Sequence, residues 1–143
     1  MADLLSTSDI RQILQKAFDE LGINAEFANR AGGFVIEYIY KTDAYPIDLD
    51  LIVDVYPNGF VATSFIFDLV EINEQSLKLV NKFNHDVLGF KAHLRGDGCL
   101  IVTAESLIQT RDALALYIKT VLEKIVSDDA VYYLLPIIKL SYK

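Results

Sequence analysis

The sequence predicts a small α+β domain in which a mostly antiparallel sheet has helices packed on one face, in the order α-β-β-β-β-α-β-β-α. Three observations lead to this fold class. Apolar residues recur at helical spacing in three segments, and the segments between them alternate with a period of two residues. The connections between the alternating segments are short, and short connections join antiparallel strands. The 143 residues are predicted to form a single domain, 1–143.

The first helix is predicted from one apolar stripe near the start of the chain. Its members recur every three or four residues: Ile10, Ile13, Leu14, Ala17, Phe18 and Leu21. Ser8 or Asp9 is expected to cap its first turn, and Gly22 is expected to end it, because glycine readily ends a helix.

Four strands are expected next, over 24–29, 34–40, 49–55 and 60–67. The clearest is 49–55, where Leu49, Leu51, Val53 and Val55 alternate with Asp48, Asp50, Ile52 and Asp54. A period of two sends alternate side chains to opposite faces, so one face of this strand should be buried. Turns are predicted at Ala31-Gly32-Gly33 and at Pro57-Asn58-Gly59.

Helical spacing returns after Asn73, which is a good capping residue, and this second helix is expected to end at Gly89. A hairpin should follow, with strands over 90–95 and 99–104 joined by Gly96-Asp97-Gly98. A third amphipathic helix is predicted over 107–126.

An apolar C-terminal extension covers about 128–143. Pro136 is expected to break or kink any helix there. Apolar segments seldom stay in water, so the extension should either pack within its own domain or across a homodimer, or bind a partner protein. The candidate partner-binding residues are Tyr132, Tyr133, Leu134, Leu135, Ile137 and Ile138.

Charge and composition argue against several functions. The formal net charge is −7, from 20 acidic and 13 basic residues, which repels nucleic acid and anionic membrane surfaces. The single cysteine, Cys99, excludes an internal disulfide. The first residues lack the pattern of a signal peptide, and the longest apolar run, 130–138, is too short to cross a membrane. A cytoplasmic location is therefore expected.

Candidate chemical sites are few. Asp48, Asp50 and Asp54, together with His93, suggest a small-ligand or metal-binding sheet face as an alternative function. The preferred interpretation of these aspartates is a solvated polar face, neutralised across strands by Lys91, His93 and Arg95. Cys99 and His93 could form part of a catalytic triad, but a buried, inert thiol is the usual outcome. We therefore expect no enzyme activity, no metal and no cofactor.

The stretch from Val80 through Glu105 contains Asn81-Lys82-Phe83-Asn84, then a hairpin and an acidic exit into a helix. In this it resembles the YbjN-like family, which is described as bacterial sensory transduction regulators with the type III secretion chaperone-like fold. The resemblance implies a non-enzymatic, chaperone-like or regulatory module that binds a segment of another protein, with a homodimer as one form. The residues themselves predict a structural role for Asn81, Phe83 and Asn84, with the asparagines bonding backbone groups at the helix end.

Overall fold

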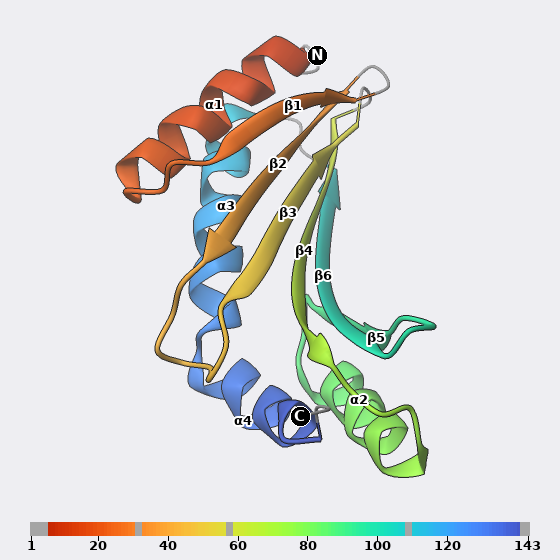
Figure 1. The fold of residues 1–143 in the computed structure, drawn as a ribbon. Coiled ribbons are helices and arrows are strands. Elements are labelled where there is room, and N and C mark those ends of the chain that lie inside the picture. Colours follow the sequence, from red (N-terminus) through yellow and green to blue (C-terminus); the bar gives the residue numbers. More distant parts are fainter. Residues whose placement is uncertain (1–5, 31–32, 57–58, 108–109, 141–143) are drawn as a thin grey trace.

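Six strands form one antiparallel sheet in the part of the chain that the computed structural model describes, residues 6–30, 33–56, 59–107 and 110–140 (Figure 1). The spatial order is β1-β2-β3-β4-β6-β5, so β1 and β5 are the two edge strands. The strands are β1 (Glu26–Arg30), β2 (Gly33–Tyr40), β3 (Leu49–Val55), β4 (Phe60–Leu69), β5 (Lys91–Leu94) and β6 (Cys99–Leu107). The helices are α1 (Thr7–Glu20), α2 (Glu74–Asp86), α3 (Arg111–Ile125) and α4 (Asp128–Ile138).

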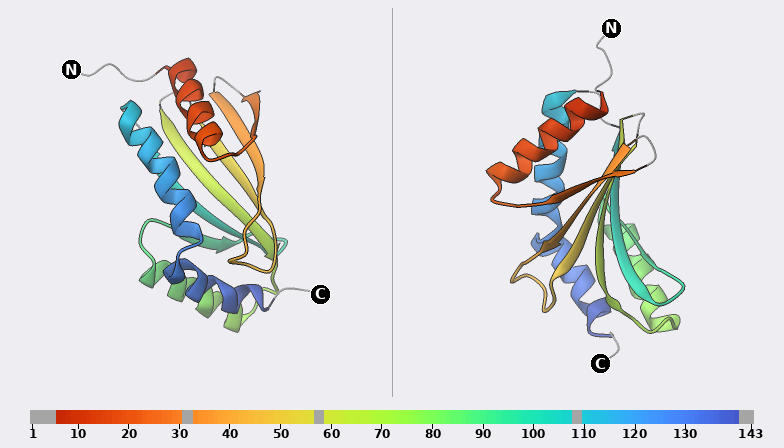
Figure 2. Two further views of the ribbon diagram at one scale, coloured as in Figure 1. Left: turned by 90° about the vertical axis from the view of Figure 1, so that its left-hand side faces the viewer. Right: turned by 45° about the horizontal axis from the view of Figure 1, so that its top comes forward.

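One face of the sheet is buried, as the alternation in the sequence predicts. In β3 the leucines and valines at 49, 51, 53 and 55 are almost fully buried, while Asp50 is exposed and Asp54 half-buried. The same alternation holds in β6, where Leu100, Val102 and Ala104 are buried. These side chains meet α1 and α3, which stand side by side over this face (Figure 2). The buried apolar side chains, from Ile10 in α1 to Ile138 in α4, thereby form one core cluster.

The other two helices pack at one end of the sheet. Helix α2 contacts the edge strand β5 and helix α4, and α4 also contacts α3 (Figures 1 and 2). The expectation that all helices cover one sheet face is therefore refined, because α2 flanks an edge instead of lying over the middle of the sheet. The predicted α+β class and the antiparallel sheet are confirmed.

Helix α4 is the main element that the predicted order lacks. It continues through Pro136 and ends two residues later at Ile138, so the expected break is wrong. Proline removes one hydrogen bond of the helix, the one to the carbonyl of Tyr132 four residues back. The buried side chains Leu134, Ile137 and Ile138 contribute about 1.5–3 kcal/mol each, which outweighs the roughly 3 kcal/mol penalty of an interior proline.

Several predicted boundaries shift. The first helix is capped by Ser6 and not by Ser8 or Asp9, because Ser6 and Asp9 form a reciprocal capping box. Helix α2 ends at Asp86, before Gly89. Leu107 ends strand β6, where it lies opposite Phe60, and does not begin a helix. The predicted turns at Ala31-Gly32-Gly33 and Pro57-Asn58-Gly59, and residues 141–143 of the tail, lie wholly or partly outside the described residues.

Candidate functional site

The apolar residues of the tail are mostly used inside the chain. Leu134, Ile137 and Ile138 are buried in the core, and Leu135 is half-buried. Tyr133 is half-buried, and the centre of its ring lies 6.0 Å from Lys82 Nζ. Tyr132 differs, with 68% of its surface exposed. Of the six candidate partner-binding residues, Tyr132 is therefore the one classed as exposed.

Asn84 holds the edge strand β5 in place. Its side-chain amide donates to the Ala92 carbonyl at 2.9 Å, and its side-chain oxygen accepts from the Ala92 amide at 2.6 Å. The bonded backbone groups thus belong to β5 and not to the end of the helix. Phe83 is fully buried beside it, whereas Asn81 is exposed. Both outward-facing backbone groups of Ala92 are consequently satisfied by one side chain.

The residues of the alternative ligand site are spread across the sheet. Asp50 and Asp54 share the uncovered face of β3, and Asp48 precedes that strand. His93 lies on β5, three strands away from β3, a separation of about 14 Å at the usual strand spacing. The expected neutralisation by the second hairpin is wrong, because Asp54 pairs with Arg30 at 2.7 Å and Arg95 pairs with Asp97.

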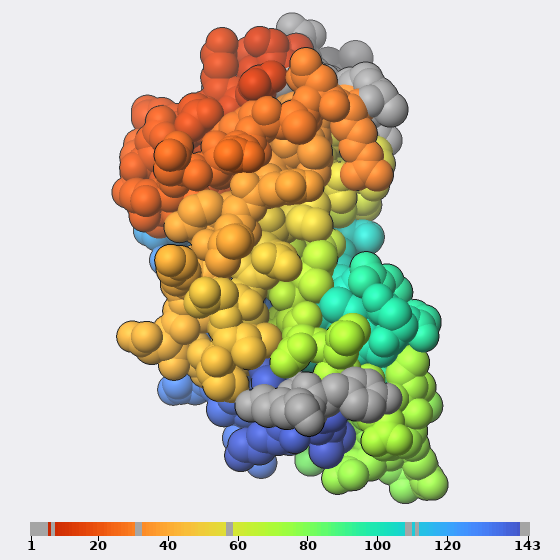
Figure 3. Space-filling view, viewed as in Figure 1, coloured from red at the N-terminus to blue at the C-terminus, as the bar shows by residue number. Residues whose placement is uncertain are grey.

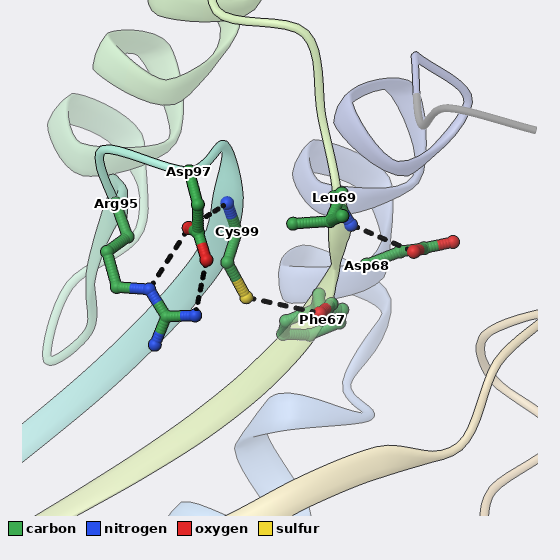
Figure 4. Close-up of polar contacts among 6 residues, drawn as sticks. All are labelled: Phe67, Asp68, Leu69, Arg95, Asp97 and Cys99. Carbon is green, nitrogen blue, oxygen red and sulfur yellow. Dashed lines mark hydrogen bonds and ion pairs between the residues drawn. The ribbon is translucent and has the colours of Figure 1, made fainter.

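Cys99 lies in a setting typical of an unreactive thiol. It is 5% exposed, and its Sγ lies 3.6 Å from the Phe67 carbonyl (Figure 4). Burial raises the pKa of this thiol, which disfavours the thiolate. His93 is exposed and lies opposite Ile101 in the strand register, and in the described chain no hydrogen bond joins it to Cys99. The proposed triad is not assembled.

The tip of the β5–β6 hairpin is held by a charged pair. Arg95 donates through two nitrogens to Asp97, which also accepts from the Cys99 amide (Figure 4). The hydrogen bond from Arg95 is the main reason why the pKa of Asp97 falls to about 2. Both side chains are exposed, so this pair shapes the turn and forms no enclosed site.

A row of isoleucines on the uncovered sheet face is the feature that sequence reasoning missed. Ile39 and Ile66 both lie opposite Asp50, and Ile66 lies opposite Ile101. Ile52 lies two residues beyond Asp50, on the same face of β3. Ile39 is 55% exposed and the others are half-buried. No described helix lies over the middle of this face (Figure 3). The signal that could have found it is Ile52 at an outward position of a strand whose other outward residues are aspartates.

A hollow of about 770 Å³ opens on this face over β1 to β4. Ile39, Ile52 and Ile66 are among its apolar lining residues, and Glu26, Glu37 and Asp50 contribute carboxylates to the lining. Lys41 contributes the one side-chain cation among the lining residues. The predicted polar outer face therefore carries isoleucines interleaved with carboxylates.

Within the described ranges, no three or more His, Cys, Asp and Glu side chains are grouped closely enough to hold a metal ion. Likewise, none of the described helices has both the length and the apolar character needed to cross a membrane.

Comparisons with known proteins identify a structural neighbour but no sequence relative. No protein-family model and no curated protein matches the sequence. Among solved structures, the Yersinia pestis type III secretion chaperone SycH, crystallised in complex with a stable fragment of YscM2, superposes with a TM-score of 0.54. The two chains are 14% identical, and the match covers 87% of this chain and 98% of SycH. At this identity the likeness establishes the fold, which confirms the predicted secretion-chaperone-like architecture.

Proposed function

We propose that this protein is a non-enzymatic interaction module, chaperone-like or regulatory, which binds a segment of a partner protein. The observation that carries the proposal is the uncovered sheet face with its isoleucine row. A soluble domain gains by burying aliphatic side chains, and a group of them left on an open face is typical of an interaction site. The fold is shared with a chaperone that was crystallised with a partner fragment, which supports the same class of function.

The proposal includes membership of the YbjN-like family, a cytoplasmic location and a homodimer. The resemblance around Asn81 and Asn84 supports the first, and the net charge of −7 suits a freely diffusing protein. Within the C-terminal tail, we assign the contact with a second copy or a partner to Tyr132, because it is the exposed residue among the six candidates.

The absence of enzyme activity is part of the same proposal. Cys99 is buried with a raised pKa, and His93 and Asp50 are separated by the width of several strands. General acid–base or nucleophilic catalysis needs groups within hydrogen-bonding reach of one another.

The test is affinity capture of partners from the source cell, with stoichiometry determined by mass spectrometry. It compares the wild type with one double variant and one single variant. Ile39→Ser/Ile66→Ser removes aliphatic surface from the face, and Leu116→Ser, at a 65% exposed leucine on α3, is the matched control. We expect one defined partner that the double variant loses and the control retains. Capture of the same partner by all three proteins would refute the assignment of this face.

Thermal unfolding of each variant should accompany the capture experiment. Retained cooperative unfolding shows that lost capture reflects the surface and not the fold. Sedimentation of the wild type and of Tyr132→Ser tests the homodimer, which predicts a twofold difference in mass between the two proteins.

A further inference from the structure

The carboxylates around the hollow are arranged in a way that the fold alone does not favour. Glu26 on β1 lies directly opposite Glu37 on β2, and both are exposed. Like charges directly opposite each other on neighbouring strands destabilise a sheet. Asp50, on the next strand, is also exposed and lines the same hollow. A cationic group bound here would relieve that repulsion.

The apolar and acidic parts of the hollow are interleaved. Glu37 lies opposite Ile52, and Asp50 lies between Ile39 and Ile66 across three strands. A ligand that covers the isoleucines must therefore also meet the carboxylates. Three carboxylates against the ammonium of Lys41 leave the lining net negative. Long lysine or arginine side chains, with aliphatic stems and charged ends, fit such a mixture.

We infer that the hollow binds a basic amphipathic segment of a partner protein, whose aliphatic side chains lie on Ile39, Ile52 and Ile66 and whose lysines or arginines reach Glu26, Glu37 and Asp50. This inference rests on the proposed function and specifies the chemical class of the partner. The net charge of −7 adds long-range attraction for such a segment.

A second copy of the chain fits this surface poorly. A twofold interface brings the same patch of both copies together, so the carboxylates of one hollow would face those of the other. Juxtaposed like charges oppose association.

The experiment measures binding of fluorescein-labelled synthetic peptides to the full chain by fluorescence anisotropy. One probe alternates lysine with valine over about nine residues, and its matched control alternates glutamate with valine. We expect the lysine probe to bind, the glutamate probe not to bind, and the affinity to fall as salt rises from about 50 mM to about 300 mM.

Two double variants locate the site. Glu37→Gln/Asp50→Asn removes the charge without changing side-chain size, and it should weaken lysine-probe binding about tenfold. Glu71→Gln/Glu74→Gln changes two exposed carboxylates outside the hollow and should bind as the wild type does. Thermal unfolding confirms that both variants fold.

Each other outcome overturns the inference. Equal binding of both probes, or unchanged binding by Glu37→Gln/Asp50→Asn, excludes a basic partner at this hollow. If the lysine probe does not bind but partner capture still depends on Ile39 and Ile66, the proposed function stands and the basic class is wrong. A dimer that dissociates in the Ile39→Ser/Ile66→Ser variant would identify the hollow as a contact between copies.

Discussion

The two edge strands of the sheet are protected very differently. At β5, Asn84 satisfies both outward-facing backbone groups of Ala92, and helix α2 packs alongside the strand. At β1, Phe27 is the one half-buried residue of the strand, and the others are exposed. Arg11 contacts the side chains of Asn29 and Phe27, and in the described chain no side chain bonds the backbone of β1.

This difference favours contacts with other chains at the β1 edge of the sheet over contacts at the β5 edge. Exposed strand edges can pair with other chains, and proteins usually blunt them with charges, helices or loops. A further strand cannot bond the backbone of Ala92 in β5 while Asn84 occupies its amide and carbonyl. The open edge β1 borders the acidic hollow through Glu26. A partner segment therefore has one accessible edge beside one accessible apolar surface.

Removing the cap from β5 should have the largest effect on stability. Asn84→Ala leaves the amide and carbonyl of Ala92 without partners, and Ala92 is 2% exposed. We expect a loss of about 2–4 kcal/mol in the free energy of unfolding, measured with urea.

The matched control is Asn81→Ala, because Asn81 is an exposed asparagine on the same helix. It should change stability by less than about 0.5 kcal/mol. Equal destabilisation by both substitutions would show that the loss comes from α2 itself and not from the closed edge. Asn84→Asp should be intermediate, since a carboxylate can accept from the Ala92 amide but cannot donate to its carbonyl.

The hairpin that carries β5 provides the next prediction. Gly98 has a φ of +89°, and a Cβ there would lie 2.5 Å from the Val70 carbonyl oxygen. Gly98→Ala should therefore lower the free energy of unfolding by about 2 kcal/mol. Gly96 is in the same turn with open space around it, so Gly96→Ala should be nearly neutral by the same urea measurement. Similar values for the two alanines would contradict the close approach of Gly98 to Val70.

The open edge should respond in the opposite direction and least strongly. Glu26→Lys replaces the repulsion from Glu37 with attraction and should stabilise the protein by about 0.2–1 kcal/mol. The gain should shrink at high salt, because both side chains are exposed. Glu71→Lys, at another exposed carboxylate, is the reference for a simple change of net charge. An equal gain in both variants would show that net charge alone is responsible.

Local patterns were sufficient to predict the strands and three helices. The alternation at 49–55 and the stripe beginning at Ile10 are set by burial on one face, which leaves a direct trace in the sequence. Leu107 was misassigned because its spacing to Leu114 fits a helix, whereas pairing with Phe60 extends β6. Helix α4 was not predicted because Pro136 was expected to break it. A proline this close to the end of a helix interrupts one hydrogen bond and leaves the buried stripe intact.

The candidate site could not be predicted in the same way. Ile39, Ile52, Ile66 and Ile101 come from four strands, and their alignment depends on the strand register and order. Neither is fixed by the spacing within any one strand. The opposition of Glu26 and Glu37 has the same origin. Asn84 and Ala92 are eight residues apart on different elements, so their pairing depends on how α2 packs against the edge.

The Asn84 bridge also sets how the protein exchanges its amide hydrogens with solvent. The outward amides of an edge strand ordinarily exchange through small local openings, long before the interior of the sheet. The Ala92 amide is bonded to a side chain carried by helix α2, which packs against β5, so its exchange requires this bond to break in a buried setting. In exchange kinetics this edge amide should behave as an interior one, and the outward amides of β1 should exchange first.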